Sequence, residues 1–390
     1  MRDVYSIYLT EGPFVRDAIE KAAEGQFIDG NTAHLLWRSD ETFNEIFDSI
    51  KSAGRFICLE FYIFRDDETG RELARLLKQK VAEGVKVYLL YDHFGSFGNH
   101  RGFWKEMQKT GIRLQASHPF KWVSPMHYIH RDHRKLIIID GQIAFTGGLN
   151  IANEYRGYRR RSKMGWRDTG IVLRGPVVSL LTSIFSRTWQ IWGGEPIKAT
   201  QTAESFSDGL PVMPIFADSS RGRRRLRKIL YYSIDNAQES ILLTTAYFVP
   251  SKRMIYALEM AVNRAVKVKL LLPGRSDIMA ADYAGRAFFK RLLRVGVQIF
   301  TYQGEILHAK TAVFDRCWSI VGSANLDFQS LRRNDEGNVG ILDSGFGKKM
   351  ADIFDGDLKH SIEIKEEDWR RRPVCEKLKE RFFVIFRRRL

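Results

Sequence analysis

Two stretches of the chain each place a histidine two residues before a lysine, at the start of an apolar run. The first is His133 with Lys135 in HRKLIIID, and the second is His308 with Lys310 in HAKTAVFD. Because side chains two residues apart on a β-strand share one face, each histidine should lie beside its lysine. A neutral imidazole can attack phosphorus or move a proton, and an adjacent ammonium group can bind a phosphate oxygen. The two stretches therefore indicate chemistry on a phosphate ester.

The same spacing continues beyond both His-Lys pairs. Each copy follows the pattern His-x-Lys-x4-Asp-x6-Gly-(Gly/Ser)-x-Asn, with identical internal spacing. The turn residues are Gly147, Gly148, Gly322 and Ser323, and the asparagines are Asn150 and Asn325. Small turn residues allow close backbone approach, and an asparagine where a helix begins would form a natural phosphate cradle. A single His-x-Lys is more often a surface strand, whereas two complete copies favour a functional site.

The two aspartates of the pattern have a structural explanation. Asp140 has the opposite strand parity from His133 and precedes Gly141, and Asp-Gly is a strong hairpin signal. The segment QIAFTGG that follows is predicted to be the returning strand. We therefore interpret Asp140 and its equivalent Asp315 as turn or scaffold carboxylates.

The elements that must position these residues also occur twice. EFYIF (60–64) is similar to TAYFV (245–249), GVKVYLLYD (84–92) to AVKVKLLLPG (265–274), and GIRLQ (111–115) to GVQIF (296–300), in the same order. Strands alternate with amphipathic helices, as the stripe of Phe43, Ile46, Phe47 and Ile50 before a strand at 56–64 indicates. Such alternation predicts an α/β layered fold.

Duplication of this plan predicts two similar halves. The first domain would span residues 1–205 with an N-terminal extension, and the second would span residues 206–390 with a basic C-terminal tail. A Gly-, Pro-, Ser- and Thr-rich linker or crossover is predicted over residues 193–214. We expect two tandem α/β/α sandwich domains packed with pseudo-twofold symmetry, since this packing can bring equivalent edges into one cleft. The active site would then lie at the domain interface.

The composition indicates a packed protein with an anionic partner. The 390 residues are 44% hydrophobic, and 62 Lys and Arg against 46 Asp and Glu give a formal net charge of +16. This charge favours nucleic acid or an acidic lipid surface. The first residues include Asp3 and Glu11 and no apolar run is long enough to span a bilayer, so we expect a soluble or peripheral protein without a signal peptide. Cys58, Cys317 and Cys375 lie far apart, which favours structural thiols in a reducing compartment.

The cluster of histidines and the two basic runs could each be a binding site or an ordinary part of the fold. Six of the nine histidines fall between His93 and His133, but no acidic or cysteine cluster completes a zinc site, so we expect neither metal nor cofactor. The basic runs 221–228 and 158–167 could be solvated helix faces, contacts for a nucleic-acid backbone or contacts for lipid headgroups. Because no aromatic-interleaved recognition module accompanies them, lipid headgroups fit better and no nucleic acid is expected.

Two aromatic segments could lie against lipid. The residues from Phe94 to Tyr128 could pack in the core or form an interfacial wall that admits a lipid. The C-terminal RFFVIFRRRL combines apolar and basic residues, which suits an anionic membrane surface. A simple C-terminal strand or a solvated tail explains that segment equally well.

These motifs resemble the phospholipase D superfamily, which is defined by two HxKx4D motifs. The segments MHYIHRDHRKLIIIDG, GGLNIANEY, WRDTGIVLRGPVV and GSANLDFQSL, followed by NDE, are most similar to bacterial cardiolipin synthases of the short type without transmembrane helices. The resemblance covers the chain from about residue 30. It implies two tandem phospholipase D-like domains and a metal-independent phosphatidyltransferase.

The resemblance also implies a role for each residue of the motifs. His133 would attack the phosphodiester to give a phosphohistidine, and His308 would act as acid and then as base, although the nearly symmetric sequence does not decide between them. Asp168 and Glu336 resemble the family's orienting acids, while Asp168 could instead be a salt-bridged surface residue beside Arg167. The residues that would bind the phosphoryl oxygens are Lys135, Lys310, Asn150 and Asn325.

The function implied is transfer of a phosphatidyl group to phosphatidylglycerol. The partners would be the anionic phospholipids phosphatidylglycerol and cardiolipin, reached by peripheral association with the cytoplasmic face of a bacterial cell membrane. Two alternatives remain: a phospholipase D-type hydrolase or nuclease acting on phosphodiesters, and a catalytically idle module that binds acidic membranes.

Overall fold

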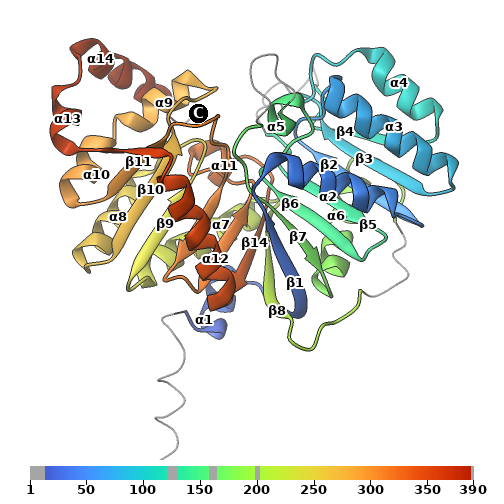
Figure 1. Cartoon of the computed structure of the whole chain (residues 1–390), viewed down its shortest axis with the longest axis horizontal. Helices are drawn as coiled ribbons and strands as arrows, with labels where there is room; N and C mark the ends of the chain where they lie inside the picture. Colours follow the sequence, from blue (N-terminus) through green and yellow to red (C-terminus); the bar gives the residue numbers. More distant parts are fainter. Residues whose placement is uncertain (1–13, 121–129, 158–164, 198–202, 388–390) are drawn as a thin grey trace, which may run out of the picture.

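The computed structural model describes residues 14–120, 130–157, 165–197 and 203–387. These residues form one 15-stranded sheet covered by helices (Figure 1). The strands of the first half are β1 (Ile28–Leu36), β2 (Phe56–Phe61), β3 (Lys86–Asp92), β4 (Arg113–Ser117), β5 (Lys135–Ile139), β6 (Ile143–Gly147) and β7 (Gly170–Arg174). Those of the second half are β8 (Leu210–Ala217), β9 (Ser240–Thr244), β10 (Lys267–Pro273), β11 (Gln298–Tyr302), β12 (Thr311–Phe314), β13 (Trp318–Gly322), β14 (Glu336–Leu342) and β15 (Ser361–Ile364).

The order of strands across the sheet repeats. From the centre outward, the first half runs β1-β7-β6-β5-β2-β3-β4, and the second runs β8-β14-β13-β12-β9-β10-β11. Strands β1 and β8 pair at the centre, and β15 extends the second half beyond β11 (Figure 1). Strands β2, β3 and β4 are parallel to one another, as are β9, β10 and β11, and the other neighbouring strands, β15 included, pair antiparallel. The duplicated α/β topology predicted from the sequence is therefore present, while the domain boundary at residues 205 and 206 stays a prediction.

The helices follow the same two-part plan. The first half has α1 (Arg16–Ala23), α2 (Ser39–Lys51), α3 (Glu68–Ala82), α4 (Arg101–Lys109), α5 (Asn153–Arg156) and α6 (Val177–Ile191). The second has α7 (Ser220–Asn236), α8 (Lys252–Asn263), α9 (Met279–Arg286), α10 (Phe289–Val295), α11 (Phe328–Arg332), α12 (Ser344–Leu358), α13 (Glu366–Arg371), α14 (Val374–Phe383) and the 3-10 turn η3 (Val384–Phe386). Within the described ranges, no helix is both long and apolar enough to cross a membrane.

The helices bury the apolar faces that the sequence predicts. Phe43, Ile46, Phe47 and Ile50 of α2 are all buried, in a core that also contains side chains of α3. Helices α7 and α8 contribute to the equivalent core of the second half. Helices α6 and α12 belong to one core cluster that includes strands of both halves. This shared core joins the two halves into one packed unit, because apolar burial is the main stabilising term in folding.

One prediction about a connecting segment is wrong in part, and one of the alternatives for the C-terminal segment is excluded. Residues 193–214 are not linker throughout, since β8 begins at Leu210 and pairs with both β1 and β14. The described part of the C-terminal segment 381–390 is not a strand, because residues 381–383 end α14, which begins directly after Pro373, and residues 384–386 form η3. Proline at a helix start has its missing N–H where no helical partner exists, so it favours this boundary.

Candidate active site

The segments that precede the two histidines cross from one half of the molecule to the other. The main-chain N–H of His133 donates to the carbonyl oxygen of Asp335 at 2.9 Å, and the N–H of His308 donates to that of Arg167 at 2.8 Å. Each acceptor comes immediately before the acidic residue that the sequence associates with the opposite motif. The two histidine motifs therefore meet where the halves join.

His133 is paired with Glu336 of the second half. The Nδ1 atom of His133 lies 3.0 Å from Glu336 Oε2, and both side chains are buried. Ser323 Oγ donates to the same oxygen of Glu336, so this oxygen acts as an acceptor. It can therefore also accept from Nδ1–H of His133, which leaves Nε2 of the imidazole without a hydrogen and available to react. Burial, reinforced by the charges of Lys135 and Lys310, lowers the pKa of His133 well below its usual value. Burial raises the pKa of Glu336 to about 8.

His308 is paired with Asp168 of the first half. The Nδ1 atom of His308 lies 2.7 Å from Asp168 Oδ2, and the other carboxylate oxygen accepts the Thr169 N–H at 2.7 Å. Burial opposes ionisation of Asp168, but the charge of Lys310 and the contact with His308 outweigh it and lower the pKa of Asp168. Burial and the charge of Lys310 lower the pKa of His308 to about 4. Lys310 Nζ lies 2.6 Å from the same Nδ1 atom. An ionised carboxylate only accepts hydrogen bonds, so the contact with Asp168 favours the tautomer of His308 that carries its hydrogen on Nδ1.

Both lysines are buried beside their histidines. Lys135 Nζ donates to the main-chain oxygen of His133 at 2.6 Å, and Lys310 Nζ donates to that of His308. Burial lowers the pKa of Lys135 to about 7 and that of Lys310 to about 8. A bound phosphate anion would oppose these shifts, because a nearby negative charge favours the ammonium form. The arrangement is thus suited to hold an anion between the two motifs.

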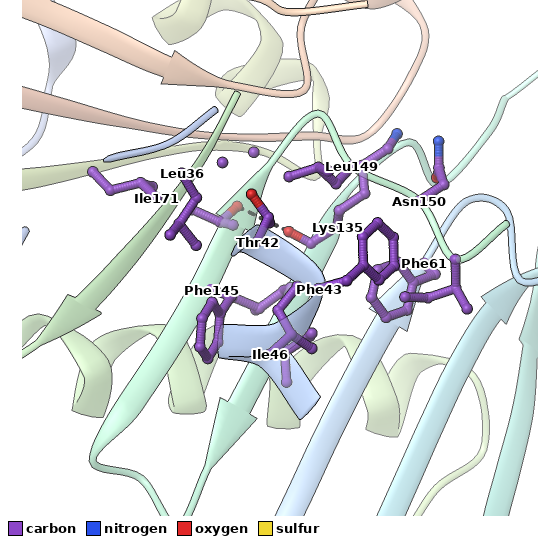
Figure 2. Close-up of a pocket in the computed structure, with 16 residues that line it drawn as sticks. Leu36, Thr42, Phe43, Ile46, Phe61, Lys135, Phe145, Leu149, Asn150 and Ile171 are labelled. Carbon is purple, nitrogen blue, oxygen red and sulfur yellow. Dashed lines mark hydrogen bonds between the residues drawn. The ribbon is translucent and has the colours of Figure 1, made fainter. Parts of the chain in front are cut away.

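A small apolar pocket lies beside Lys135 and Asn150. Figure 2 shows both residues at one end of the pocket with their polar ends directed the same way, and Ile46 and Phe145 at the other end. The cavity has a volume of about 20 Å³, which is room for about one water molecule and no substrate. Its apolar wall disfavours charge on Lys135, which accounts for the lowered pKa of that side chain.

The two asparagines brace the ends of strands next to the histidines. Asn150 Nδ2 donates to Tyr155 Oη at 2.7 Å, and that hydroxyl oxygen lies 3.5 Å from both ring nitrogens of His308. Asn325 Oδ1 accepts from Thr245 Oγ1 at 3.3 Å. Neither asparagine begins a helix, because α5 and α11 each start three residues later and are only four and five residues long. Each asparagine therefore lies three residues before a short helix, and its part in a phosphate cradle stays a prediction.

The small residues of the turns make room for the acidic residues. A Cβ atom on Gly148 would lie 2.1 Å from Asp168 Oδ1, so a larger residue there would displace that carboxylate. The equivalent position in the second half is Ser323, whose hydroxyl instead donates to Glu336. Gly147 and Gly322 precede these two positions, and a Cβ on either would meet the neighbouring strand within 2.6 Å.

The aspartates of the two motifs lie in turns at the far ends of β5 and β12. Asp140 and Asp315 have φ angles of 53° and 48°. Their carboxylates accept main-chain N–H groups at 2.7–2.8 Å from Gly54, Arg55, Phe56, Gln238, Glu239 and Ser240. Both residues thus fasten a hairpin turn to the strand beside it and make no contact with the histidines.

Four aromatic residues around the histidines were not predicted. The ring centroid of Tyr62 lies 5.0 Å from that of His133, and those of Tyr155, Trp166 and Tyr247 lie 5.3, 5.5 and 6.2 Å from that of His308. Tyr62 and Tyr247 are the third residues of the repeated stretches EFYIF and TAYFV, which was the signal that could have identified them. These rings restrict access of water to both imidazoles.

The remaining sequence features divide between core, surface and undescribed segments. The basic run 221–228 lies in α7, where Arg221, Arg225 and Lys228 form ion pairs with Glu24, the C-cap residue of α1. Most of the run 158–167, and Trp122, His127 and Tyr128, lie outside the described residues. In the part of the chain that the structure describes, no group of three or more His, Cys, Asp and Glu could hold a metal ion. Phe103 and Trp104 pack against the first-half core, whereas Phe97 is 74% exposed.

Comparisons with known proteins agree with this geometry. The family described as "Cardiolipin synthase, PLD-like domain" matches residues 46–189 and 230–358, one segment in each half. Cardiolipin synthase 2 of Bacillus cereus is 34% identical over 350 residues, covering 88% of this chain and 68% of the relative. Cardiolipin synthase A of Pseudomonas fluorescens is 31% identical over 363 residues, covering 93% and 75%.

A solved structure extends the likeness to the whole fold. The crystal structure of phosphatidylserine synthase from Haemophilus influenzae matches with a TM-score of 0.75 and 15% sequence identity, covering 96% of this chain and 99% of that one. At this identity the match concerns the fold alone. With the family match over both halves, it follows that the chain belongs to the cardiolipin synthase family of PLD-like proteins and is a phospholipid phosphatidyltransferase.

Proposed function

We propose that this enzyme makes cardiolipin by moving a phosphatidyl group from one phosphatidylglycerol to the hydroxyl of another, with release of glycerol. The observation that best supports the proposal is the pair of buried histidines, each with Nδ1 against a carboxylate of the opposite half. Burial favours the neutral form of both imidazoles, which is the form that can attack phosphorus or accept a proton.

The first half-reaction forms a covalent intermediate on His133. Its Nε2 attacks phosphorus, the bond between phosphorus and the glycerol oxygen breaks, and the glycerol oxygen takes a proton from the His308 imidazolium. His308 must be protonated for this step, and the bound phosphodiester anion opposes the lowering of its pKa. Asp168 holds Nδ1–H of His308 and stabilises the imidazolium.

The second half-reaction reverses these roles. His308 Nε2 accepts the proton of the incoming phosphatidylglycerol hydroxyl, the resulting oxygen attacks phosphorus, and the phosphorus–nitrogen bond to His133 breaks. The neutral imidazole of His133 is regenerated, so no net proton or electron is consumed. Positioned acid–base catalysis of this kind contributes about 10²–10⁴-fold.

Lys135 and Lys310 would stabilise the charge on the phosphoryl oxygens in both half-reactions. Their buried ammonium groups lie where water provides little competing solvation, so each interaction is stronger than in solution. Asn150 and Asn325 would then hold the side chains that line the site, since their amide groups already form hydrogen bonds with Tyr155 and Thr245. The anionic substrate also suits a protein with a net charge of +16, which we propose acts on the cytoplasmic face of the cell membrane as a peripheral protein.

The test is incubation of the purified protein with phosphatidylglycerol vesicles and identification of lipid products by mass spectrometry. We expect cardiolipin and an equal amount of glycerol. If phosphatidic acid is the sole product, the enzyme is a hydrolase and the transferase proposal fails. Chelator should leave the rate unchanged, and complete loss of activity with chelator would contradict a metal-independent mechanism.

A further inference from the structure

Helix α14 and the turn η3 carry a row of exposed apolar side chains. Val374, Leu378, Phe382 and Ile385 are 68%, 58%, 56% and 73% exposed. Their spacing of four, four and three residues places them on one face of the helix. We call these four residues the α14 stripe. Isolated exposed apolar residues are common, but a continuous row along a helix marks a surface that contacts another apolar phase.

The opposite face of α14 is firmly attached to the protein. Glu380 is buried and forms an ion pair with Arg372 at 2.5 Å, and Phe383 stacks on Tyr283 of α9 with ring centroids 5.8 Å apart. Arg286 of α9 forms a further ion pair with α14. Because these contacts hold the helix in a defined orientation, the α14 stripe is presented outward by the fold.

The surface formed by α9 and α14 lies next to the end of the sheet that carries the two histidines. Tyr247 contacts His308, with ring centroids 6.2 Å apart, and its hydroxyl donates to Asp277 at 2.9 Å. The next residues are Ile278 and Met279, which are 43% and 64% exposed and lead into α9. Figure 1 shows α14, α9 and α5 along the upper side of the molecule, with α9 between α14 and α11; α5 and α11 are the helices that follow the two asparagines. A lipid bound by His308 is therefore close to the surface that α9 and α14 form.

The charges beside the stripe favour an anionic bilayer over a neutral one. Lys377 and Arg381 lie on α14 at helical positions that flank the stripe on one side. Arg387 follows η3, and the sequence continues with three more residues of which two are arginine. An exposed apolar row with an adjacent row of cations is the pattern of a helix that lies in the plane of an acidic membrane interface.

We propose that the α14 stripe, together with Ile278 and Met279, is the surface by which the enzyme docks on an anionic phospholipid bilayer. The stripe enters the headgroup region, Lys377 and Arg381 contact lipid phosphates, and the catalytic edge faces the membrane from which substrates arrive. This inference rests on the proposed function because it supposes a lipid substrate. It adds which face meets the membrane.

The test compares the double variant Leu378→Glu/Ile385→Glu with the control Leu180→Glu. Leu180 is also exposed, at 41%, but lies near the start of α6, at the end of the sheet away from the histidines. We expect the double variant to bind phosphatidylglycerol vesicles at least about tenfold more weakly in a sedimentation assay, whereas the control binds like the wild type. Vesicles of phosphatidylcholine alone should bind the wild type weakly.

Two further measurements separate docking from chemistry. The double variant should turn over a water-soluble short-chain phosphatidylglycerol at the wild-type rate while losing activity on vesicles. His133→Ala should still bind vesicles, so failure of the proposed reaction would leave the binding result intact. Unchanged vesicle binding by the double variant would overturn the proposal. A second result would also overturn it: sedimentation velocity shows that the wild type is a dimer and the double variant a monomer, while vesicle binding is unchanged. In that case a second copy of the chain, and not a bilayer, would cover the stripe.

Discussion

His133 and His308 occupy equivalent positions in the two halves, and the acidic side chains that hold them have pKa values shifted in opposite directions. Asp168 is held in the ionised form because Lys310 and His308 outweigh its burial, whereas burial raises the pKa of Glu336 to about 8. An ionised carboxylate stabilises an imidazolium, and a carboxyl group that is largely protonated near pH 7 does so poorly. The comparison favours His308 for the acid–base role, which the sequence alone left undecided.

The residues behind the two motifs differ as well. The residue between His133 and Lys135 is Arg134, which is 1% exposed and forms ion pairs with Glu60 at 2.8 Å and Asp132 at 2.9 Å. In the second motif Ala309 replaces Arg134, Thr244 replaces Glu60 and Leu307 replaces Asp132. The equivalent space therefore has no ion pair of this kind. The two motifs therefore have identical spacing, but the first is packed against a buried ion-pair cluster and the second against uncharged side chains.

The largest difference between the halves should appear when the two acids are replaced by amides. Asp168→Asn should lower kcat/KM by about 10³–10⁴-fold at pH 7, because an amide cannot stabilise the imidazolium and can hold the wrong tautomer. Glu336→Gln should cost only about tenfold, since the glutamate is largely uncharged at that pH. Steady-state kinetics on phosphatidylglycerol in mixed micelles measure both variants. Equal losses would contradict the assignment of unequal roles.

A second difference concerns stability. Arg134→Met should lower the free energy of unfolding by about 3–5 kcal/mol, because it leaves the buried carboxyl groups of Glu60 and Asp132 without their cation. Ala309→Gly, at the equivalent position, should cost about 1 kcal/mol through loss of one methyl group and added chain entropy. Urea denaturation of the three proteins gives these values. A loss for Arg134→Met no greater than that for Ala309→Gly would show that the ionic support is dispensable.

The smallest expected effect is on the pH dependence of stability. The pKa of His308 is lowered from 6.5 to about 4, so the unfolded chain takes up a proton at higher pH than the folded protein does. The contribution of this group is present above pH 6.5 and is lost as pH falls toward 4, by an amount on the order of 3 kcal/mol. Wild type should therefore lose more stability between pH 6.5 and 4.5 than His308→Gln in urea titrations. Identical slopes for the two proteins would indicate that His308 titrates normally.

The repeat in the sequence predicted the two-part fold because the same apolar patterns recur in the same order. It also predicted that both His-Lys pairs belong to one site and that the motif aspartates lie in turns. Strand periodicity alone could not show that each histidine takes its carboxylate from the opposite half, since that contact depends on how the halves pack. The main-chain hydrogen bonds from His133 to Asp335 and from His308 to Arg167 depend on the same packing of one half against the other.

Two errors have a common physical cause. The sequence suggested that Asn150 and Asn325 begin helices, but the helices start three residues later. Asn150 Oδ1 instead accepts from the Ile63 N–H, and Asn325 Oδ1 accepts from Thr245 Oγ1. The end of the supposed linker is strand β8, because its partners β1 and β14 supply the hydrogen bonds that local composition does not predict. In both cases contacts distant in sequence override a local signal.

The most direct test of the proposed division of roles uses a phosphatidyl ester of p-nitrophenol, whose good leaving group needs no acid. In rapid-mixing experiments His308→Ala should release one equivalent of p-nitrophenol per enzyme and then stop, with the phosphatidyl group found on His133 by peptide mass spectrometry. His133→Ala should release none. A burst that survives in His133→Ala, with the label on His308, would contradict the account by exchanging the roles of the two histidines.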